Sequence, residues 1–476
     1  MIPQSAPDEP REFCGVIGVH GHPEAAEMAY LSLYALQHRG QEGCGIVSSD
    51  GIRLYKHLGQ GLVNDVFHAP EILRTLKGGQ AIGHNRYSTT GSDQLINIQP
   101  IVVNSKEGPL ALGHNGNLVN YRSLRERLQS EGAIFQTSTD SEIILHLIAR
   151  SRCGRFTECV KEALNAVRGA YSLVLLSREC LIAARDPGGF RPLALGRLEG
   201  GAWAVASETC AFDLIGAEYV RDVEPGEMIV FDEYGMRSEK LEGAGRRSSC
   251  IFEFIYFSRP DSRIFGECVD KTRRKFGKRL VEEHPVDADI VISVPDSSNT
   301  AALGFARRSG LKFELGLIRN HYIGRTFIQP QQSIRNFGVK VKFNPVEGVL
   351  KGRRVVVVED SIVRGTTLRT LTQFIRKAGA TEVHIRVSSP PILHPCYYGM
   401  DFPTREELIA SNRSVEEIRE FLQVDSLGYL SREGMLASVP GEGGDYCTAC
   451  FDGNYPVPFD DPVEKIHFDG PLREAR

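Results

Sequence analysis

The run VVVVEDSIVRGTT, residues 355–367, decides the fold of the second half of the chain. Val355–Val358 are apolar on both sides, which is typical of a strand buried in a parallel sheet. Glu359 and Asp360 follow the strand directly, and the glycine and threonines after them are suited to begin a helix. Parallel sheets bind ligands at the carboxyl ends of their strands, and a helix N-terminus binds phosphate through its N–H groups. Because the acids can accept hydrogen bonds from sugar hydroxyls, the run predicts a site for a sugar phosphate.

The segments around this run repeat the order strand, loop, helix. Ile290–Val294 is predicted as a strand, and a polar loop and the helix Thr300–Arg307 follow it. A second helix is predicted from residue 366 to Gly379, after which Glu382–Val387 returns as a strand. This alternation is typical of an α/β domain with a parallel sheet.

The first half of the chain has a different pattern. It contains many short strands that are apolar on both faces, which suits a layered α+β sandwich. The predicted strands are Gly15–Val19, Gly45–Ser48, Ala81–Asn85, Leu110–Asn115, Ser172–Leu176 and Leu181–Arg185. Two helices are predicted, Glu24–Leu36 and Asp140–Ile148, and the second follows a Ser-Thr-Asp cluster suited to capping.

The length of 476 residues exceeds what one hydrophobic core serves, so more than one domain is expected. The polar, glycine-rich stretch 241–249 marks the boundary. We therefore divide the chain into a leader of residues 1–13, a first domain of residues 14–245 and a second domain of residues 246–476.

Composition excludes several classes of function. Hydrophobic residues make up 41% and charged residues 24%, and the net charge is −4, which argues against a general binder of nucleic acid or anionic membranes. No apolar run approaches the length of a membrane span, and the leader lacks the hydrophobic core of a secretory signal. We expect a cytoplasmic protein.

Cys14 is the most informative residue of the first half, because it stands between the polar leader and the first predicted strand. If the leader is removed, Cys14 carries both a thiol and a free α-amine. An α-amine titrates near pH ~8 and can act as a local base for its own side chain. Taken alone, Cys14 is equally a small buried strand residue, since free cysteines are usually buried.

The 355–367 run resembles the loop with which type I phosphoribosyltransferases hold phosphoribosyl pyrophosphate (PRPP). That family usually has two aspartates, whereas this chain has Glu359 first. Residues 294–297 resemble the family's second loop, and residues 319–327, with Arg335, Lys340 and Lys342, resemble its mobile flap; a solvated cationic loop is the alternative. The resemblance implies PRPP binding by Ser361, Arg364, Gly365, Thr366, Thr367 and Arg325 and Mg²⁺ binding by Ser297, Glu359 and Asp360.

Four segments of the first half resemble the N-terminal-nucleophile glutamine amidotransferases: His38–Gly43, Gly83–Gly91, Gly113–Asn117 and Thr137–Glu142. That resemblance implies an αββα sandwich with Cys14 as the nucleophile. It assigns the oxyanion to Asn115 and the backbone N–H of Gly116. It assigns the α-carboxylate of glutamine to Arg86, assisted by Thr89, and the α-ammonium to Asp140. Singly, Arg86 and Asp140 would be read as a surface ion pair or a helix cap.

The chain contains 11 cysteines, more than packing requires in a reducing compartment. Cys447 and Cys450 form a C-x-x-C pair, which is compatible with zinc, redox chemistry or iron–sulfur. Cys396 is a further candidate ligand, and spacing alone does not choose between Cys250 and Cys268. The remaining cysteines are interpreted as packing residues: Cys44, Cys153, Cys159, Cys180 and Cys210, and Cys268 joins them on the family resemblance given below.

Together the two halves resemble the glutamine PRPP amidotransferases. One branch of that family carries a [4Fe–4S] cluster and a cleaved leader, which implies cluster ligands Cys250, Cys396, Cys447 and Cys450, with Zn²⁺ as the alternative. The resemblance implies the synthesis of 5-phosphoribosylamine from PRPP, glutamine and water, with ammonia passing between the domains. It also implies purine nucleotides as feedback inhibitors and a homotetramer. The alternatives are an amidotransferase acting on a hexose phosphate and a PRPP-sensing regulatory protein without synthetic activity.

Overall fold

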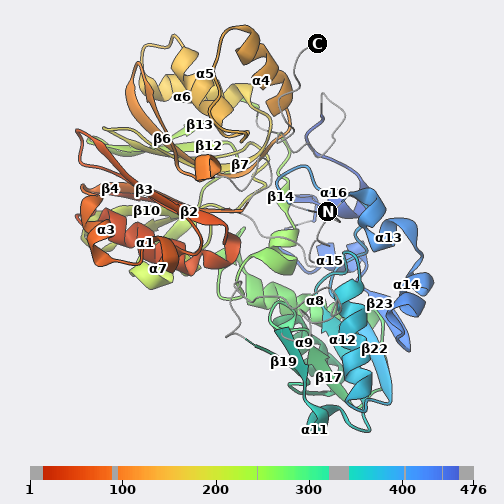
Figure 1. Cartoon of the computed structure of the whole chain (residues 1–476). Coiled ribbons are helices and arrows are strands. Elements are labelled where there is room, and N and C mark those ends of the chain that lie inside the picture. The colour runs from red at the N-terminus through yellow and green to blue at the C-terminus, as the bar shows by residue number, and fades with distance from the viewer. Residues whose placement is uncertain are drawn as a thin grey trace, which may run out of the picture.

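The computed structural model describes residues 14–87, 95–243, 245–320, 342–400, 402, 404–441 and 443–459. In this part of the chain, the first half forms two large antiparallel sheets and the second half forms one large parallel sheet (Figure 1). The predicted combination of an α+β sandwich and an α/β sheet is confirmed.

Within the described residues, the first sheet has seven strands in the antiparallel order β11-β9-β10-β1-β4-β2-β3. They are β1 (Gly15–His20), β2 (Gly43–Ser49), β3 (Leu54–Gln60), β4 (Gln80–Arg86), β9 (Ala194–Arg197), β10 (Trp203–Ala206) and β11 (Glu218–Asp222). The second sheet, counted over the same residues, has six antiparallel strands in the order β13-β12-β8-β7-β6-β5. They are β5 (Ile101–Ser105), β6 (Gly108–Leu118), β7 (Gly169–Leu176), β8 (Leu181–Arg185), β12 (Glu227–Asp232) and β13 (Gly235–Lys240).

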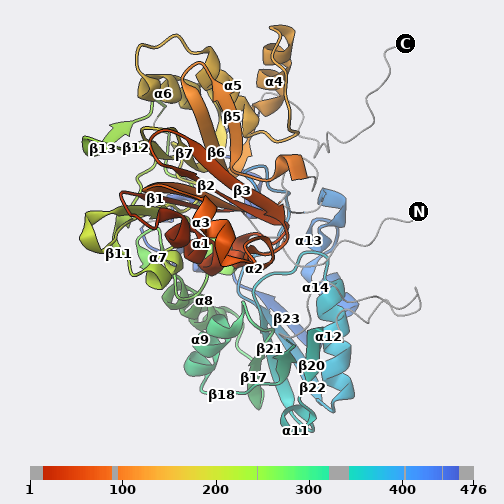
Figure 2. The same cartoon turned by 60° about the vertical axis from the view of Figure 1, so that its left-hand side comes forward.

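Helices cover the outer faces of both sheets, which gives an αββα sandwich (Figures 1 and 2). Val16 and Val47 of the first sheet pack directly against Val174 and Ile229 of the second in the middle of the sandwich. The outer layer of the first sheet contains α1 (Ala25–Ala35) and α7 (Cys210–Ile215). The outer layer of the second contains α4 (Tyr121–Ser130), α5 (Glu142–Arg150) and α6 (Phe156–Ala166). The shorter elements are η1 (Gln37–Arg39), α2 (Val63–Val66), α3 (Pro70–Thr75), η2 (Leu95–Asn97) and η3 (Glu199–Gly201).

The parallel sheet of the second half has the order β18-β17-β21-β22-β23, counted over the described residues. Its strands are β17 (Ile290–Ser293), β18 (Lys312–Phe313), β21 (Arg354–Glu359), β22 (Glu382–Val387) and β23 (Ser426–Tyr429). Val356 and Val358 face α8 (Val269–Glu283) and α9 (Asn299–Ser309), whereas Val355 and Val357 face α12 (Thr366–Lys377) and α14 (Val415–Leu422). Burial on both faces explains why this strand consists of consecutive valines.

Short elements connect the parallel sheet to the sandwich and to the end of the chain. They are β14 (Ser249–Cys250), the π-helical turn η4 (Glu253–Phe257), β15 (Arg263–Ile264), β16 (Glu267–Cys268), β19 (Leu317–Arg319), β20 (Phe343–Pro345), α11 (Glu347–Leu350), η5 (Arg405–Glu407), α13 (Ile409–Asn412), α15 (Arg432–Leu436), β24 (Tyr446–Cys447) and α16 (Ala449–Asp452). Strand β14 follows the sandwich and pairs in parallel with β24 near the end of the described chain. This pairing ties the start of the second half to its tail.

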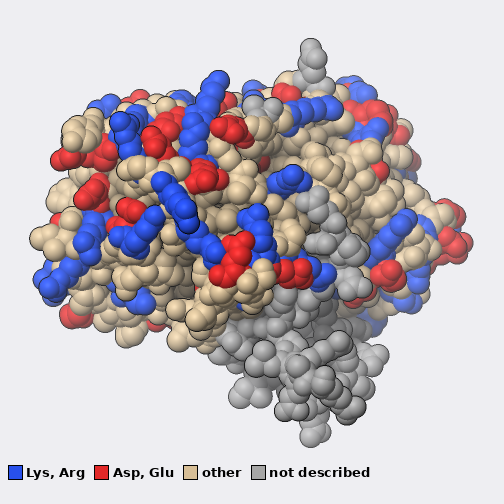
Figure 3. All heavy atoms as spheres, turned by 90° about the horizontal axis from the view of Figure 1, so that it is seen from above, with Lys and Arg blue, Asp and Glu red and all other residues tan. Residues whose placement is uncertain are grey.

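The surface carries charge of both signs. On the face that Figure 3 shows, Lys and Arg side chains alternate with Asp and Glu side chains, without a large patch of one sign over the described residues. None of the helices in the described ranges is both long enough and apolar enough to span a bilayer.

Candidate active sites

Cys14 lies at the entrance to β1, the middle strand of the first sheet. The side chain is buried, and its Sγ donates a hydrogen bond of 3.4 Å to the main-chain oxygen of Tyr87. Burial raises the pKa of the Cys14 thiol to about 11, and the nearby Arg86 guanidinium offsets part of that shift. The thiol is therefore protonated at neutral pH, and a base must accept its proton when it attacks a substrate.

Arg86 and Asp140 both lie within electrostatic range of this thiol. Arg86 ends β4 and donates a hydrogen bond of 2.6 Å from Nη1 to the main-chain oxygen of Asn97. Asp140 is 4% exposed, and its Oδ2 accepts a hydrogen bond of 2.8 Å from the N–H of Leu118. A buried cation and a buried anion thus flank Cys14, as recognition of the two ends of an amino acid requires.

The Ser-Thr-Asp cluster before α5 does not have the predicted capping role. The helix begins at Glu142, and its N-cap residue Ser141 makes no capping hydrogen bond through its side chain. The residue before the cluster, Thr137, instead binds the Glu142 carboxylate, whose Oε2 accepts hydrogen bonds from the N–H and the hydroxyl of Thr137, both 2.7 Å long. The Asp140 carboxylate accepts a hydrogen bond from Leu118 of β6 rather than from the helix.

Asn115 and Gly116 lie on β6, which packs against β1 from the second sheet. Asn115 is fully buried, and neither its Oδ1 nor its Nδ2 has a hydrogen-bond partner among the described residues. Leaving a buried amide unpaired is costly, so such a group indicates a site that a ligand completes. Gly116 has φ +152°, and a Cβ atom there would lie 2.0 Å from the Ala170 oxygen, so the position requires glycine.

A second group of predicted residues meets at the carboxyl end of the parallel sheet. Ser297 Oγ donates a hydrogen bond of 2.5 Å to Asp360 Oδ2, and Ser361 Oγ donates one of 2.6 Å to Asp360 Oδ1. Glu359 Oε1 accepts hydrogen bonds from the Asp360 N–H at 3.1 Å and from the Ser298 hydroxyl at 3.4 Å. Two carboxylates and a hydroxyl at one sheet edge suit Mg²⁺, which commonly binds through one or two carboxylates together with substrate phosphates.

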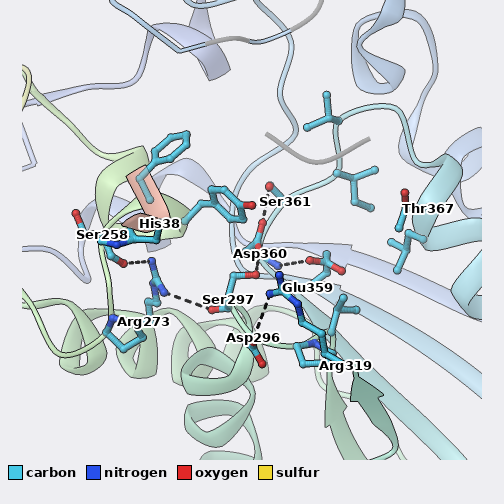
Figure 4. Close-up of a pocket in the computed structure, with 18 of the residues that line it drawn as sticks. His38, Ser258, Arg273, Asp296, Ser297, Arg319, Glu359, Asp360, Ser361 and Thr367 are labelled. Atoms are coloured by element: carbon cyan, nitrogen blue, oxygen red, sulfur yellow. Dashed lines mark hydrogen bonds and ion pairs between the residues drawn. The ribbon is translucent and has the colours of Figure 1, made fainter. Parts of the chain in front are cut away.

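These residues line a cavity of about 320 Å³ (Figure 4). The cavity extends from Glu359 and Thr367 of the parallel-sheet half to His38 and Gln41 of the sandwich. Its wall contains residues of both halves: His38, Gln41, Tyr256–Pro260, Arg273, Val294–Ser297, Arg319, Lys342, Glu359–Val363, Gly365, Thr367 and Leu368. One open cavity therefore reaches from Glu359 and Asp360, the acid pair, to the segment that follows α1.

Not every predicted ligand faces this cavity. Arg364 forms an ion pair of 3.0 Å between its Nη2 and Glu407 Oε1, and neither Arg364 nor Thr366 lines the cavity wall. Gly365 has φ +76° at the start of α12, and a Cβ atom there would come within 3.0 Å of Ile409, so glycine is required. Several predicted features lie outside the described ranges: the leader of residues 1–13, Thr89, and the flap residues 321–327, which include Arg325, together with Arg335 and Lys340.

The four predicted cluster cysteines come from distant parts of the sequence and meet beside the sandwich. Cys250 and Cys447 are register partners in the β14–β24 pair, and Cys450 lies in the first turn of the short helix α16 that follows. Burial raises the pKa of Cys447 and Cys450 well above the ordinary value, and the neighbouring thiols of Cys250 and Cys396 raise both further. Cys268 lies elsewhere, at the start of α8, where its Sγ is 3.8 Å from the Pro260 oxygen.

The donor set fits a soft metal centre, since the thiols of Cys250, Cys396 and Cys447 all lie within electrostatic range of Cys450. Within the described residues, no group of three or more His, Cys, Asp or Glu side chains is arranged closely enough to hold a single metal ion.

Sequence reasoning missed a buried ionic cluster between the two halves. Arg39 and Arg191 from the sandwich meet Glu253 of η4, with Arg39 Nη2 at 2.8 Å and Arg191 Nη1 at 3.4 Å from Glu253 Oε1. Arg39 also pairs with Glu208, and all four side chains are at most 1% exposed. Isolated charged residues in these segments give no periodic or spacing signal, so only the tertiary structure reveals them.

Comparison with known proteins agrees with this architecture. A family model described as "Glutamine amidotransferase domain" matches residues 84–213. The chain is 51% identical to the amidophosphoribosyltransferase of Bacillus subtilis (strain 168), over 94% of each chain, and 52% identical to the chloroplastic amidophosphoribosyltransferase of Vigna aconitifolia, over 94% of this chain and 92% of that one.

A solved structure gives the same result. The structure of the glutamine PRPP amidotransferase of B. subtilis in complex with ADP and GMP is 50% identical and superposes with a TM-score of 0.90, covering 94% of this chain and 99% of that one. Identity at this level over nearly the whole of both chains establishes the family, and with it the class of enzyme, a glutamine-dependent phosphoribosyltransferase. The chain belongs to the amidophosphoribosyltransferase family.

Proposed function

We propose that this chain converts PRPP, glutamine and water into 5-phosphoribosylamine, glutamate and pyrophosphate, the first committed step of purine synthesis. The reaction divides into two half-reactions that exchange one molecule of ammonia. The observation that carries the proposal is the 320 Å³ cavity, because residues of the sandwich and of the acid-pair loop line the same space.

The first half-reaction belongs to Cys14. The thiolate attacks the side-chain carbonyl carbon of glutamine, the C–N bond breaks, and ammonia leaves behind a thioester that water hydrolyses to glutamate. Arg86 and Asp140 hold the α-carboxylate and α-ammonium of glutamine, and Thr89 assists Arg86. The unpaired amide of Asn115 and the N–H of Gly116 stabilise the oxyanion, and one such donor contributes about a 10²–10³-fold rate increase in comparable sites.

The second half-reaction belongs to the parallel sheet. Ammonia attacks C1 of PRPP, and the bond from C1 to the pyrophosphate oxygen breaks. Glu359, Asp360 and Ser297 are the residues that would hold Mg²⁺, which neutralises the charge of the leaving pyrophosphate when bound. We assign the 5-phosphate to the loop that opens α12, with Ser361, Gly365, Thr366 and Thr367, and we assign further contacts with PRPP to Arg364 and Arg325.

Maturation and the metal centre complete the proposal. We propose that residues 1–13 are a leader whose removal frees the amine of Cys14, that residues 14–245 form the amidotransferase domain and that residues 246–476 form the phosphoribosyltransferase domain. We further propose that Cys250, Cys396, Cys447 and Cys450 hold one [4Fe–4S] cluster with a structural role. Their mutual effect on pKa supports this assignment, because it places all four thiols within electrostatic range of one another.

The proposal extends to regulation and assembly. The B. subtilis structure contains ADP and GMP, so we propose purine nucleotides as feedback inhibitors of this chain too. We propose a homotetramer in the cytoplasm, on the family resemblance described above. Oligomeric state is measurable by light scattering on the processed protein.

A stoichiometric assay tests the function. Purified protein, PRPP, glutamine and Mg²⁺ are incubated, and glutamate and pyrophosphate are quantified together. We expect equal amounts of both products, with each depending on the presence of both substrates for sustained turnover. Glutamate release without any pyrophosphate would show that the chain is only a glutaminase, and it would contradict the proposal.

A further inference from the structure

The hydroxyl of Ser141 lies at the centre of a buried hydrogen-bond network beside Asp140, the residue assigned to the α-ammonium of glutamine. Ser141 Oγ donates a hydrogen bond of 3.3 Å to Asp140 Oδ1. It accepts one of 3.1 Å from Gln99 Nε2, and it lies 2.9 Å from His114 Nδ1. All four residues are at most 4% exposed. The contact between Ser141 and Asp140 is therefore shielded from water.

The three partners of this hydroxyl use its whole hydrogen-bonding capacity. A serine hydroxyl has one proton and two acceptor positions, whereas an ionised carboxylate only accepts. The proton of Ser141 therefore goes to Asp140, and the amide of Gln99 and the Nδ1–H of His114 both donate to Ser141. Gln99 also accepts a hydrogen bond of 2.8 Å at its Oε1 from the N–H of His114 on β6. The orientation of the Ser141 hydroxyl is thus fixed by both neighbours.

Helix capping does not explain this hydroxyl. A serine at the start of a helix usually accepts a hydrogen bond from a backbone N–H of the first turn. Ser141 is the N-cap residue of α5, but its side chain makes no such bond. The alanine variant therefore removes the contacts with Asp140, Gln99 and His114 without removing a helix cap.

Asp140 is held at both carboxylate oxygens. Oδ2 accepts the hydrogen bond of 2.8 Å from the N–H of Leu118, and Oδ1 accepts the one from Ser141. Each carboxylate oxygen has two acceptor positions, so one on each remains for a ligand. The negative charge of Asp140 acts on the Cys14 thiol, which places the carboxylate at the glutamine site. Two fixed contacts therefore set the direction in which this anion meets a substrate.

The segment that contains Gln99 also holds the opposite charge of the site. The main-chain oxygen of Asn97 accepts a hydrogen bond of 2.6 Å from Arg86 Nη1. The Asn97 side chain binds Ser138, with Oδ1 accepting from the N–H at 3.0 Å and Nδ2 donating to Oγ at 2.9 Å. Residues 97–99 thus hold Arg86 directly and Asp140 through its neighbours. One short segment sets the spacing between a cation and an anion whose ligands sit on a single carbon atom of an α-amino acid.

We propose that Ser141 is a positioning residue that sets the preference of the Cys14 site for substrates with an α-ammonium group. It acts through Asp140, whose Oδ1 it orients, and Gln99 holds the hydroxyl in place. The α-ammonium does not change during attack on the side-chain amide, so the contribution is to binding rather than to the chemical step. This role rests on the proposed function, because it takes Asp140 as the partner of the α-ammonium.

The test compares two reagents that alkylate Cys14 in the full processed chain, with the concentrations of PRPP and Mg²⁺ held constant. One is 6-diazo-5-oxo-L-norleucine, a glutamine analogue with the α-amino group. The other is 6-diazo-5-oxohexanoate, the same molecule without that group. Mass spectrometry of the peptide that begins at Cys14 gives a second-order rate constant for each, and their ratio measures the preference. In the unmodified protein we expect a ratio of at least about 30.

In Ser141→Ala the ratio should fall about tenfold, which is the effect of losing one hydrogen bond to a charged group. The fall should come from the amino reagent alone, because the reagent without the α-amino group has no contact with Asp140 to lose. A variant that merely disturbs the fold or the thiol slows both reagents and leaves the ratio unchanged. The ratio therefore separates positioning of Asp140 from general damage.

Two further variants complete the design. Ser49→Ala is the matched control, since Ser49 is a buried serine that donates a hydrogen bond of 3.0 Å to the Arg178 oxygen, at the end of β2 opposite the partner of Arg86. It should keep the full ratio. Asp140→Asn should lose the preference, and adding Ser141→Ala to it should change the ratio by less than about twofold, because the two residues act as one unit.

A replacement variant covers the case in which Ser141→Ala does not fold. Gln99→Met removes the 3.1 Å hydrogen bond to Ser141 with a side chain of similar length, and the ratio should fall at least about threefold. An unchanged ratio in Ser141→Ala or in its replacement, equal slowing of both reagents, or the same fall in Ser49→Ala would overturn the role of Ser141.

The same measurements keep this role separate from the proposed function. If the unmodified protein reacts equally with both reagents, or if Asp140→Asn keeps the preference, the assignment of Asp140 fails and the role of Ser141 fails with it. If the unmodified protein shows the preference, Asp140→Asn loses it and Ser141→Ala retains it, the role of Ser141 alone is refuted.

Discussion

Ser297 and Asp360, 63 residues apart in the sequence, share a hydrogen bond of 2.5 Å between Oγ and Oδ2 at the carboxyl edge of the parallel sheet. The contact joins the loop after β17 to the loop after β21, and both loops line the cavity. Neighbouring parallel strands end at the same edge, so this meeting follows from the topology of the sheet.

Replacing Asp360 tests the acid pair. Asp360→Asn keeps the shape of the side chain and removes the charge that would hold Mg²⁺. We expect synthesis of phosphoribosylamine to fall by about 10²-fold or more with either glutamine or ammonia as nitrogen donor, in line with the loss of one electrostatic contact at a reacting centre. Asp289→Asn, at the opposite end of the same sheet, is the control and should retain activity. Full activity of Asp360→Asn would show that the reaction does not need the Asp360 carboxylate.

The unpaired amide of Asn115 predicts a selective defect. In Asn115→Ala, glutamine-dependent kcat should fall by about 10²–10³-fold while ammonia-dependent synthesis stays near the unmodified rate. The exposed Asn104 on β5 offers a control, since Asn104→Ala should alter neither rate. Equal losses with both nitrogen donors would show that Asn115 supports the fold rather than the oxyanion.

The pH dependence of Cys14 alkylation separates the two forms of the chain. With the leader attached, burial holds the thiol pKa at about 11, so the thiolate fraction and the alkylation rate should rise about tenfold per pH unit between pH 7 and pH 10. Removal of the leader supplies an amine that titrates near pH ~8, so the rate should rise earlier and level off. N-terminal sequencing identifies each form; identical profiles for both would contradict a role for the amine.

The cysteine assignment predicts the metal content. Protein purified without oxygen should contain about four iron and four sulfide per chain, with an EPR signal after reduction. Cys250→Ser should lose most of this iron, whereas Cys268→Ser should retain it, because Cys268 lies at the start of α8, apart from the four proposed ligands. Stoichiometric zinc without iron would contradict the iron–sulfur assignment and show that the cysteines bind Zn²⁺ instead.

The elements with strong local patterns were predictable from the sequence. The strand at residues 354–359 and the helix at residues 366–377 agree with the prediction to within two residues, because consecutive valines and one apolar helix face leave few alternatives. The same holds for the strand that follows Cys14, and all six strands predicted in the first half are present.

Long-range contacts were not predictable in this way. The Ser-Thr-Asp cluster was wrongly predicted to cap α5, because the competing contact of Asp140 with the N–H of Leu118 depends on how β6 packs. Likewise, Glu208 and Glu253 are ordinary acids in the sequence, and only the fold places them around Arg39. Sequence spacing also left Cys250 and Cys268 equivalent, whereas the β14–β24 pairing brings only Cys250 beside Cys447.

The central claim is that one chain contains two separable half-reactions, and Cys14→Ala tests it most directly. Phosphoribosylamine synthesis is measured on this variant with glutamine and, separately, with ammonia at a pH where the free base is abundant. We expect no glutamine-dependent product and an ammonia-dependent rate close to that of the unmodified protein. Loss of both activities in a folded variant, or persistence of glutamine-dependent synthesis, would contradict the division of labour between Cys14 and the acid-pair site.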